Sequence, residues 1–196
     1  MKLHEVLARI AEPVLGSSAH ECYLLQRALQ HDSQWPKGPR GPGGGPDATP
    51  TTLALVLLSS MVKDPKRDIG HRTYAYYGLP TEGTKRAGWG TEDSPPALRV
   101  GKRCGLTKAP TFGGAIERIV RDVKLARRVQ TVELVQDWNE AVICWGPRSK
   151  IQTSRFMDGQ GAIAKNNANA LGTLRSTSRI EGKALVAMAE ELSEDV

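Results

Sequence analysis

A run of fifteen residues, 36–50, constrains the fold of this chain more than any other feature of its sequence. Ten of the fifteen are glycine or proline, in the order PKGPRGPGGGPDATP. Proline removes backbone donors and glycine loses the most conformational entropy on ordering, so this run cannot form a helix or an inner strand. It lies between two segments with helical patterns and contains Lys37 and Arg40. We therefore predict a basic loop between short helices near the start of the chain.

The segments on both sides of this loop carry helical signals. Residues 2–12 show the i, i+3, i+4, i+7 spacing of a single apolar face. Residues 19–31 follow the Ser-x-x-Glu spacing of a capping box, and residues 51–62 are apolar nearly all round. We expect three short helices in a helix-turn-helix-like head over 1–62, with the third helix buried. An ordinary helical hairpin is the alternative.

The middle of the chain, residues 63–110, is rich in glycine and proline and poor in apolar residues. This composition predicts an irregular linker. Its aromatic residues Tyr74, Tyr76, Tyr77 and Trp89 are expected to form a small satellite cluster. A surface that stacks unpaired bases is the alternative for these rings.

Regular patterns return after residue 110. We predict an amphipathic helix over 112–128, strands over 130–136, 141–145 and 151–157, a loop at 166–169 and a closing helix over 179–192. The expected fold class is α+β. It combines the helical head and its Gly/Pro-rich loop, the linker, and a unit over 111–196 made of a helix, a small antiparallel β-meander and a C-terminal helix.

Positive charge is concentrated in the second half of the chain. The formal net charge is +6, but residues 99–128 carry nine basic residues against two acidic ones, and residues 148–183 carry seven against two. The ends, 1–34 and 184–196, are acidic on balance. This distribution favours a polyanionic partner. A basic protein without a polyanionic partner is the alternative.

The stretch from Trp35 to Met61 resembles a group of phage and prophage proteins that are taken to be DNA-binding regulators. In that group a helix-turn-helix-like head ends in a Pro-Lys-Gly-x-Arg-Gly-x-Gly loop, and a leucine-rich helix comes next. The matching loop positions here are Pro36, Lys37, Gly38, Arg40, Gly41 and Gly43. The resemblance implies binding of double-stranded DNA and a role in transcription regulation inside a bacterial host cell.

The candidate DNA-binding residues fall into three groups. Gln26, Arg27 and Gln30 of the second expected helix are the candidates for base edges, although this helix is poor in base-reading residues. Lys37 and Arg40 are expected to reach phosphates from the loop. A non-specific grip on phosphates is expected from Arg118, Arg121, Lys124, Arg127 and Arg128.

No residue spacing is typical of a metal or cofactor site. The four histidines and three cysteines include no Cys-x-x-Cys or His-x-x-x-His pair, so we expect neither a metal nor a cofactor. Three distant cysteines are typical of reduced thiols in the cytoplasm. No stretch approaches the ~20 apolar residues of a membrane span, so we expect a cytoplasmic protein with no membrane partner.

Two other functions stay open. The first is a structural or assembly protein of a phage particle, and self-association into a homo-oligomer would fit it. The second is a metal-dependent nuclease that uses Asp158 with Glu181 and Lys183. Against the nuclease, Glu181 and Lys183 are expected at the start of a helix rather than on a strand beside Asp158, and we expect no enzymatic activity.

Overall fold

The computed structural model describes residues 1–30, 35–36, 38, 45–62, 69–82, 103–157 and 176–193. In chain order these residues form α1 (Leu3–Ile10), η1 (Ala11–Leu15), α2 (Ala19–Gln30), α3 (Pro50–Met61), α4 (Ile69–Tyr77), α5 (Phe112–Arg121), α6 (Val123–Ala126), β1 (Val129–Val135), η2 (Gln136–Trp138), β2 (Glu140–Trp145), β3 (Gln152–Phe156), β4 (Thr177–Glu181) and α8 (Gly182–Ser193). The strands make an antiparallel sheet in the order β3-β2-β1-β4. The α+β class predicted from the sequence is confirmed.

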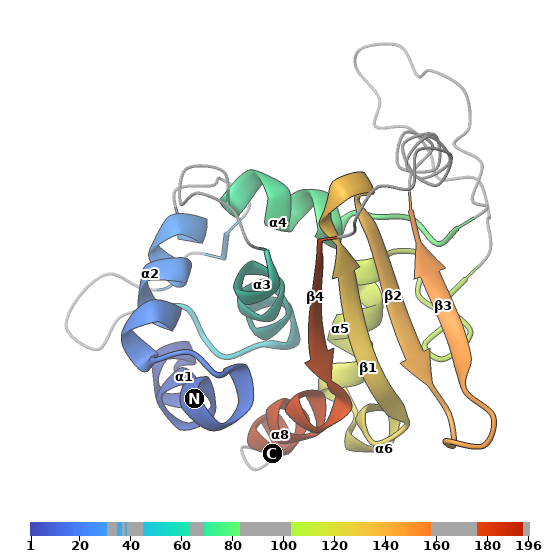
Figure 1. Cartoon of the computed structure of the whole chain (residues 1–196). Helices are drawn as coiled ribbons and strands as arrows, with labels where there is room; N and C mark the ends of the chain where they lie inside the picture. Colours follow the sequence, from blue (N-terminus) through green and yellow to red (C-terminus); the bar gives the residue numbers. More distant parts are fainter. Residues whose placement is uncertain are drawn as a thin grey trace.

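Helices cover one face of this sheet and continue beyond its β4 edge (Figure 1). The helices α5 and α8 pack against the face that carries Val132 and Leu134 of β1, both fully buried. The helices α1 to α4 lie on the far side of β4 (Figure 1). One hydrophobic cluster contains Leu3 and Leu57 of the helical part together with Val132 of the sheet, so the two parts share a core.

The first three predicted helices are present, and local side-chain contacts explain where they begin. At α2 the Glu21 carboxylate accepts hydrogen bonds from the Ser18 backbone N–H and hydroxyl, at 2.7 and 3.0 Å. At α3 the Thr49 hydroxyl accepts from the Thr52 N–H at 3.1 Å, with Pro50 at the first helical position. As expected from its composition, α3 is buried along most of its length.

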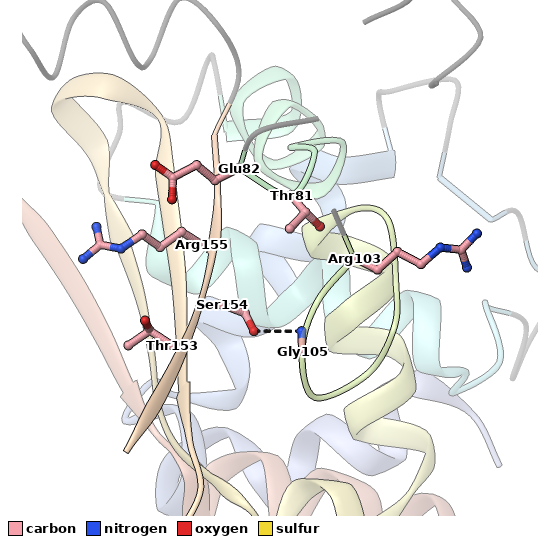
Figure 2. Close-up of a pocket in the computed structure, with 7 residues that line it drawn as sticks. All are labelled: Thr81, Glu82, Arg103, Gly105, Thr153, Ser154 and Arg155. Carbon is pink, nitrogen blue, oxygen red and sulfur yellow. Dashed lines mark hydrogen bonds between the residues drawn. The ribbon is translucent and has the colours of Figure 1, made fainter. Parts of the chain in front are cut away.

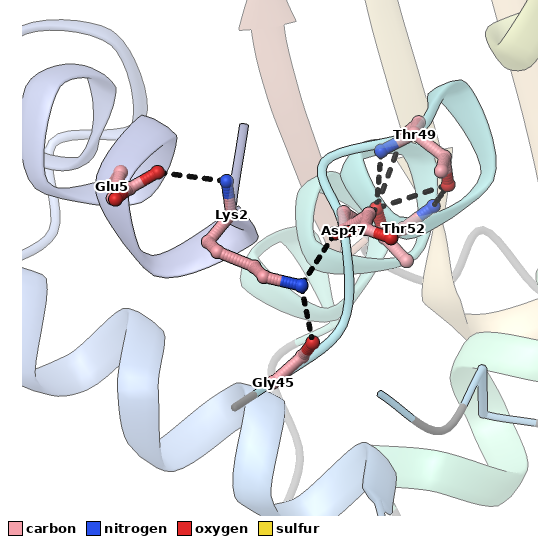
Figure 3. Close-up of polar contacts among 6 residues, drawn as sticks. All are labelled: Lys2, Glu5, Gly45, Asp47, Thr49 and Thr52. Carbon is pink, nitrogen blue, oxygen red and sulfur yellow. Dashed lines mark hydrogen bonds and ion pairs between the residues drawn. The ribbon is translucent and has the colours of Figure 1, made fainter. Parts of the chain in front are cut away.

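Lys2 ties the start of α1 to the C-terminal end of the Gly/Pro-rich loop (Figure 3). Its ammonium group lies 2.7 Å from the Asp47 carboxylate and 3.5 Å from the Gly45 carbonyl oxygen. The Leu3 N–H donates to the Pro46 carbonyl at 3.1 Å. The hydrogen bond and ion pair with Lys2 lower the pKa of Asp47. These contacts hold one end of the loop against the helical part of the protein.

The prediction of an irregular linker is wrong for residues 69–77, which form α4. The Tyr76 ring is buried and its hydroxyl donates to the Val135 carbonyl at 3.3 Å, while the Tyr77 hydroxyl donates to the Glu117 carboxylate. These tyrosines therefore join helices to the core instead of forming an isolated cluster. Tyr74 is partly buried against the same core, and Trp89 lies outside the described residues.

The second half of the chain differs from the predicted elements at two places. The helix predicted over 112–128 is broken at Asp122, which has extended backbone angles and whose carboxylate accepts from the Lys124 N–H at 2.8 Å to begin α6. Residues 179–181, expected in the last helix, belong to β4, where Ile180 pairs with Val132. A side chain at Gly182 would overlap the Val129 carbonyl, so a glycine suits the tight step from β4 into α8. The strands predicted around 130–136, 141–145 and 151–157 are confirmed as β1, β2 and β3.

Candidate nucleic-acid interface

The cations predicted for the phosphate grip are all exposed, but the break at Asp122 divides them among three elements. They are Arg118 and Arg121 on α5, Lys124 on α6, and Arg127 and Arg128 in the turn before β1. Because α6 starts a new axis, these side chains do not form one straight helical stripe. They lie on three successive segments, and Figure 1 shows α6 at the end of the sheet where β1 begins.

Carboxylates of the described residues neutralise little of this charge. Arg127 forms an ion pair with Glu190 of α8 at 3.2 Å, and both side chains are about half exposed or more. Arg121 and Lys124 have no ion pair with any of the residues that the structure describes. The nearby Asp122 carboxylate is occupied by backbone N–H groups. As far as the described chain extends, these two cations are therefore available to an anionic ligand.

The buried indole of Trp145 brings the loop at 103–108 beside these cations. The Arg128 guanidinium lies over the indole ring, 5.3 Å from its centroid, and the ring's N–H donates to the Ser154 hydroxyl at 3.2 Å. A Cβ atom at Gly105 would lie 3.0 Å from the same ring, so the loop backbone packs on the indole. Arg118 donates to the Thr107 carbonyl at 2.7 Å. The exposed Lys108 follows Thr107 directly in the chain.

The turn between β2 and β3 adds two more cations. The Gly146 N–H donates to the Arg128 carbonyl at 2.8 Å, and the Gln130 side chain donates to the Gly146 carbonyl at 3.0 Å. The exposed Arg148 and Lys150 come directly after it in this turn. We call the combined set the basic surface; it comprises Lys108, Arg118, Arg121, Lys124, Arg127, Arg128, Arg148 and Lys150. Sequence reasoning noted the charge near 148 but had no signal for its position beside Arg128.

The residues predicted to read bases on α2 are only partly available. The prediction that Gln26 contacts base edges is corrected, because its side chain lies on the buried side of α2 and only 7% of the residue is exposed. Arg27 is exposed, and it donates to the Tyr23 hydroxyl at 3.2 Å while lying over the Tyr23 ring. Gln30 is exposed at the end of α2. The next helix, α3, is buried and cannot enter a groove of DNA in this fold.

The loop and the basic surface do not form one continuous site in the described part of the chain. Lys37 and Arg40, predicted to contact phosphates, lie outside the described residues. In Figure 1, α2 lies at one end of the molecule and the β2–β3 turn at the other. The candidate site is therefore the basic surface alone.

Two of the residues considered for a nuclease, Glu181 and Lys183, lie at the step from β4 into α8. The expectation that Glu181 begins a helix is wrong, because it is the last residue of β4 and pairs with Thr131. Phe156 at the β3 edge pairs with Ala141 of β2, which pairs with Leu134 of β1, and Leu134 pairs with Ser178 at the β4 edge. Three strand spacings separate these edges, about 14 Å. Asp158 itself lies outside the described residues.

A polar groove of about 400 Å³ lies between β3 and the loop at 103–105 (Figure 2). Its lining residues are Thr81, Glu82, Arg103, Gly105, Thr153, Ser154 and Arg155. Figure 2 shows Ser154 directed at Gly105, with a hydrogen bond of 3.2 Å from the Gly105 N–H to its hydroxyl. The Arg103 and Arg155 side chains point away from each other, so they do not converge on one anion.

Within the described ranges, no three His, Cys, Asp or Glu side chains are grouped in a way that could hold a metal ion. No helix in the same ranges is long and apolar enough to cross a bilayer. No protein family matches the sequence, and neither curated proteins nor solved structures gave a significant match. The resemblance to phage regulators stays a prediction, and a functional proposal must rest on the geometry of the basic surface.

Proposed function

We propose that this protein binds double-stranded DNA, and that the basic surface contacts the phosphate backbone. The observation that supports this most strongly is that three segments in contact with one another carry eight exposed cations, with one carboxylate ion pair among them in the described part of the chain. Neutralising phosphates with such side chains releases condensed counterions, which drives association without reading sequence. A role in phage-related transcription regulation is the finer part of this proposal and rests on the resemblance.

The arrangement of aromatic residues favours a duplex over unpaired strands. Proteins that bind single strands present exposed rings on which bases stack. Trp145 has 8% of its surface exposed and is covered by Arg128, while Tyr76 is buried in the core. Tyr23 is an exposed aromatic residue, but it lies on α2, away from the basic surface. The described part of the basic surface therefore offers cations to a backbone and no platform for bases.

A salt titration with charge-matched variants tests the proposal. Fluorescence anisotropy of a labelled duplex is measured over a range of salt concentrations for the parent protein and for Arg121→Gln/Lys124→Gln. If both cations contact phosphates, the slope of log affinity against log salt becomes shallower by about 2. The expected effect is specific because neither side chain has an ion pair with another described residue.

The control is Arg9→Gln/Arg179→Gln, which removes the same charge elsewhere. Arg9 pairs with Glu191 at 2.9 Å, and Arg179 pairs with Glu181 at 3.2 Å. We expect this variant to keep the parent slope. Equal loss of affinity in both variants would show a general charge effect and would remove the basic surface from the proposal.

Base reading by α2 is tested separately. Arg27→Ala/Gln30→Ala is expected to reduce discrimination among duplex sequences while leaving the salt slope within about 1 of the parent value. A selection from random duplexes compares the two proteins. Identical sequence preferences would exclude α2 as the reading element.

A further inference from the structure

The turn between β2 and β3 ends in an exposed aliphatic residue that follows two cations of the basic surface. Ile151 has 54% of its surface exposed and comes directly after Lys150 and before β3. Among the described residues Tyr23 and Leu24 are also large, apolar and exposed, but both lie on α2. Single exposed apolar residues are common on proteins, so the surroundings of Ile151 decide what it can contact.

Main-chain contacts give this turn a defined shape. The Lys150 N–H donates to the Pro147 carbonyl at 2.8 Å and closes the turn. Gly146 has a φ of 98°, and a Cβ atom there would lie 3.1 Å from the Lys150 carbonyl oxygen, so a glycine suits this position. The Gly146 N–H also donates to the Arg128 carbonyl at 2.8 Å. The turn that carries Ile151 is therefore held against the residue that precedes β1.

The charges around Ile151 favour a duplex over a protein as its partner. Arg148 and Lys150 are exposed, and neither has an ion pair with any residue in the ranges that the structure describes. Figure 1 shows the turn at the same end of the sheet as α6, which carries Lys124. The centre of a protein interface is poor in charged residues. In a duplex, by contrast, phosphates flank a stack of apolar base faces.

We propose that Ile151 inserts from the minor groove between two base pairs of the bound duplex and kinks it there. This inference rests on the proposed DNA binding and adds how the duplex is shaped and which sequences bind best. The minor groove is about 6 Å wide, and neighbouring strands lie ~5 Å apart, so the turn enters it tip first. Apolar wedges of this kind unstack one base step and bend the duplex by about 20–90°. A TA step unstacks easily, so it is the preferred site of insertion.

The test measures energy transfer between dyes at the two ends of a duplex of about 25 base pairs, in which one TA step interrupts a stiff A-tract. Saturation with the parent protein should bring the ends closer and raise the transfer. Ile151→Ser keeps every cation, so the salt slope should stay within about 1 of the parent value. Its affinity should fall by about fivefold, and the transfer should stay at the value of the free duplex.

Two matched variants show whether the effect belongs to an apolar side chain at this position. Ile151→Leu keeps an aliphatic wedge and should bend the duplex like the parent. Leu24→Ser removes an exposed apolar side chain from α2 and should also bend it like the parent. Bending by Ile151→Ser equal to that of the parent, or loss of bending in Leu24→Ser, would overturn the proposal.

Two measurements on the parent protein need no variant. The fluorescence of 2-aminopurine placed in the TA step should rise on binding, because the step is unstacked. An uninterrupted A-tract should bind about fivefold more weakly than the duplex with the TA step. A parent protein that binds the duplex with a steep salt dependence but leaves it straight and stacked refutes the wedge alone. Absence of duplex binding refutes the proposed function together with the wedge.

Discussion

Gln136 provides the sharpest test of whether the helical part and the sheet form one cooperative unit. Its side chain is 8% exposed and donates hydrogen bonds to the Met61 carbonyl at 3.2 Å and to the Ser178 hydroxyl at 3.0 Å. Met61 is the last residue of α3, so its carbonyl is one that the helix cannot satisfy internally. One amide group thus joins α3 to β4 from the end of β1.

The expected cost of Gln136→Leu comes from these two contacts. Each hydrogen bond contributes about 1 kcal/mol net, and a buried acceptor left without a partner costs about 1–3 kcal/mol. We therefore expect the free energy of unfolding to fall by about 2–4 kcal/mol. The control is Gln130→Leu, which removes a single bond to the Gly146 carbonyl at a partly exposed position. Water can replace that bond, so the expected loss is about 1 kcal/mol or less.

Urea unfolding followed by circular dichroism and by tryptophan fluorescence measures both variants. The two signals should change together, because one hydrophobic cluster runs through both parts. The reasoning is refuted if Gln136→Leu is no more destabilising than Gln130→Leu. It is also refuted if the helical signal and the fluorescence signal unfold in separate transitions in the parent protein.

Two other predictions concern the tyrosines of α4. A methyl group added by Gly113→Ala would overlap the Tyr77 ring, and we expect the resulting strain of about 1–3 kcal/mol to outweigh the roughly 1 kcal/mol gained in helix propensity. In a Tyr77→Ala background the same change should stabilise the protein, and urea unfolding of the four proteins decides the sign. Burial raises the pKa of Tyr76 to about 12 and also raises the pKa of Tyr77, so folding favours the protonated phenols. The stabilisation of the fold by these protonated phenols is complete below the unfolded tyrosine pKa of about 10 and is lost as the pH rises toward 12. The free energy of unfolding should therefore decline between pH 8 and 11, and less steeply in Tyr76→Phe. A free energy that stays constant over this range would contradict the reasoning.

Local sequence signals predicted the elements whose boundaries depend on neighbouring residues. The Ser18–Glu21 capping box begins α2, and Thr49 with Pro50 begins α3, because these groups satisfy N–H groups within the same turn. Alternation of side chains likewise predicted β1 to β3. These signals require no knowledge of the rest of the chain, and they are also where sequence and structure agree best.

Distant contacts decided the elements that sequence reasoning missed. The segment at 69–77 has a weak helical pattern and becomes α4 because Tyr76 and Tyr77 find partners on β1 and α5. Residues 177–181 become β4 because β1 offers an open edge for pairing. In both cases tertiary packing outweighs a weak local preference.

For the candidate site, too, the sequence determined some features and the tertiary structure decided others. The sequence alone determined that the second half carries a large excess of positive charge, because charge depends only on composition. The tertiary structure decided that Arg148 and Lys150 join Arg128 and that Gln26 is turned away from solvent. Adjacency between residues far apart in the chain is set by which surfaces are buried together: the Trp145 ring packs against Gly105 and under the Arg128 guanidinium, which holds these segments together.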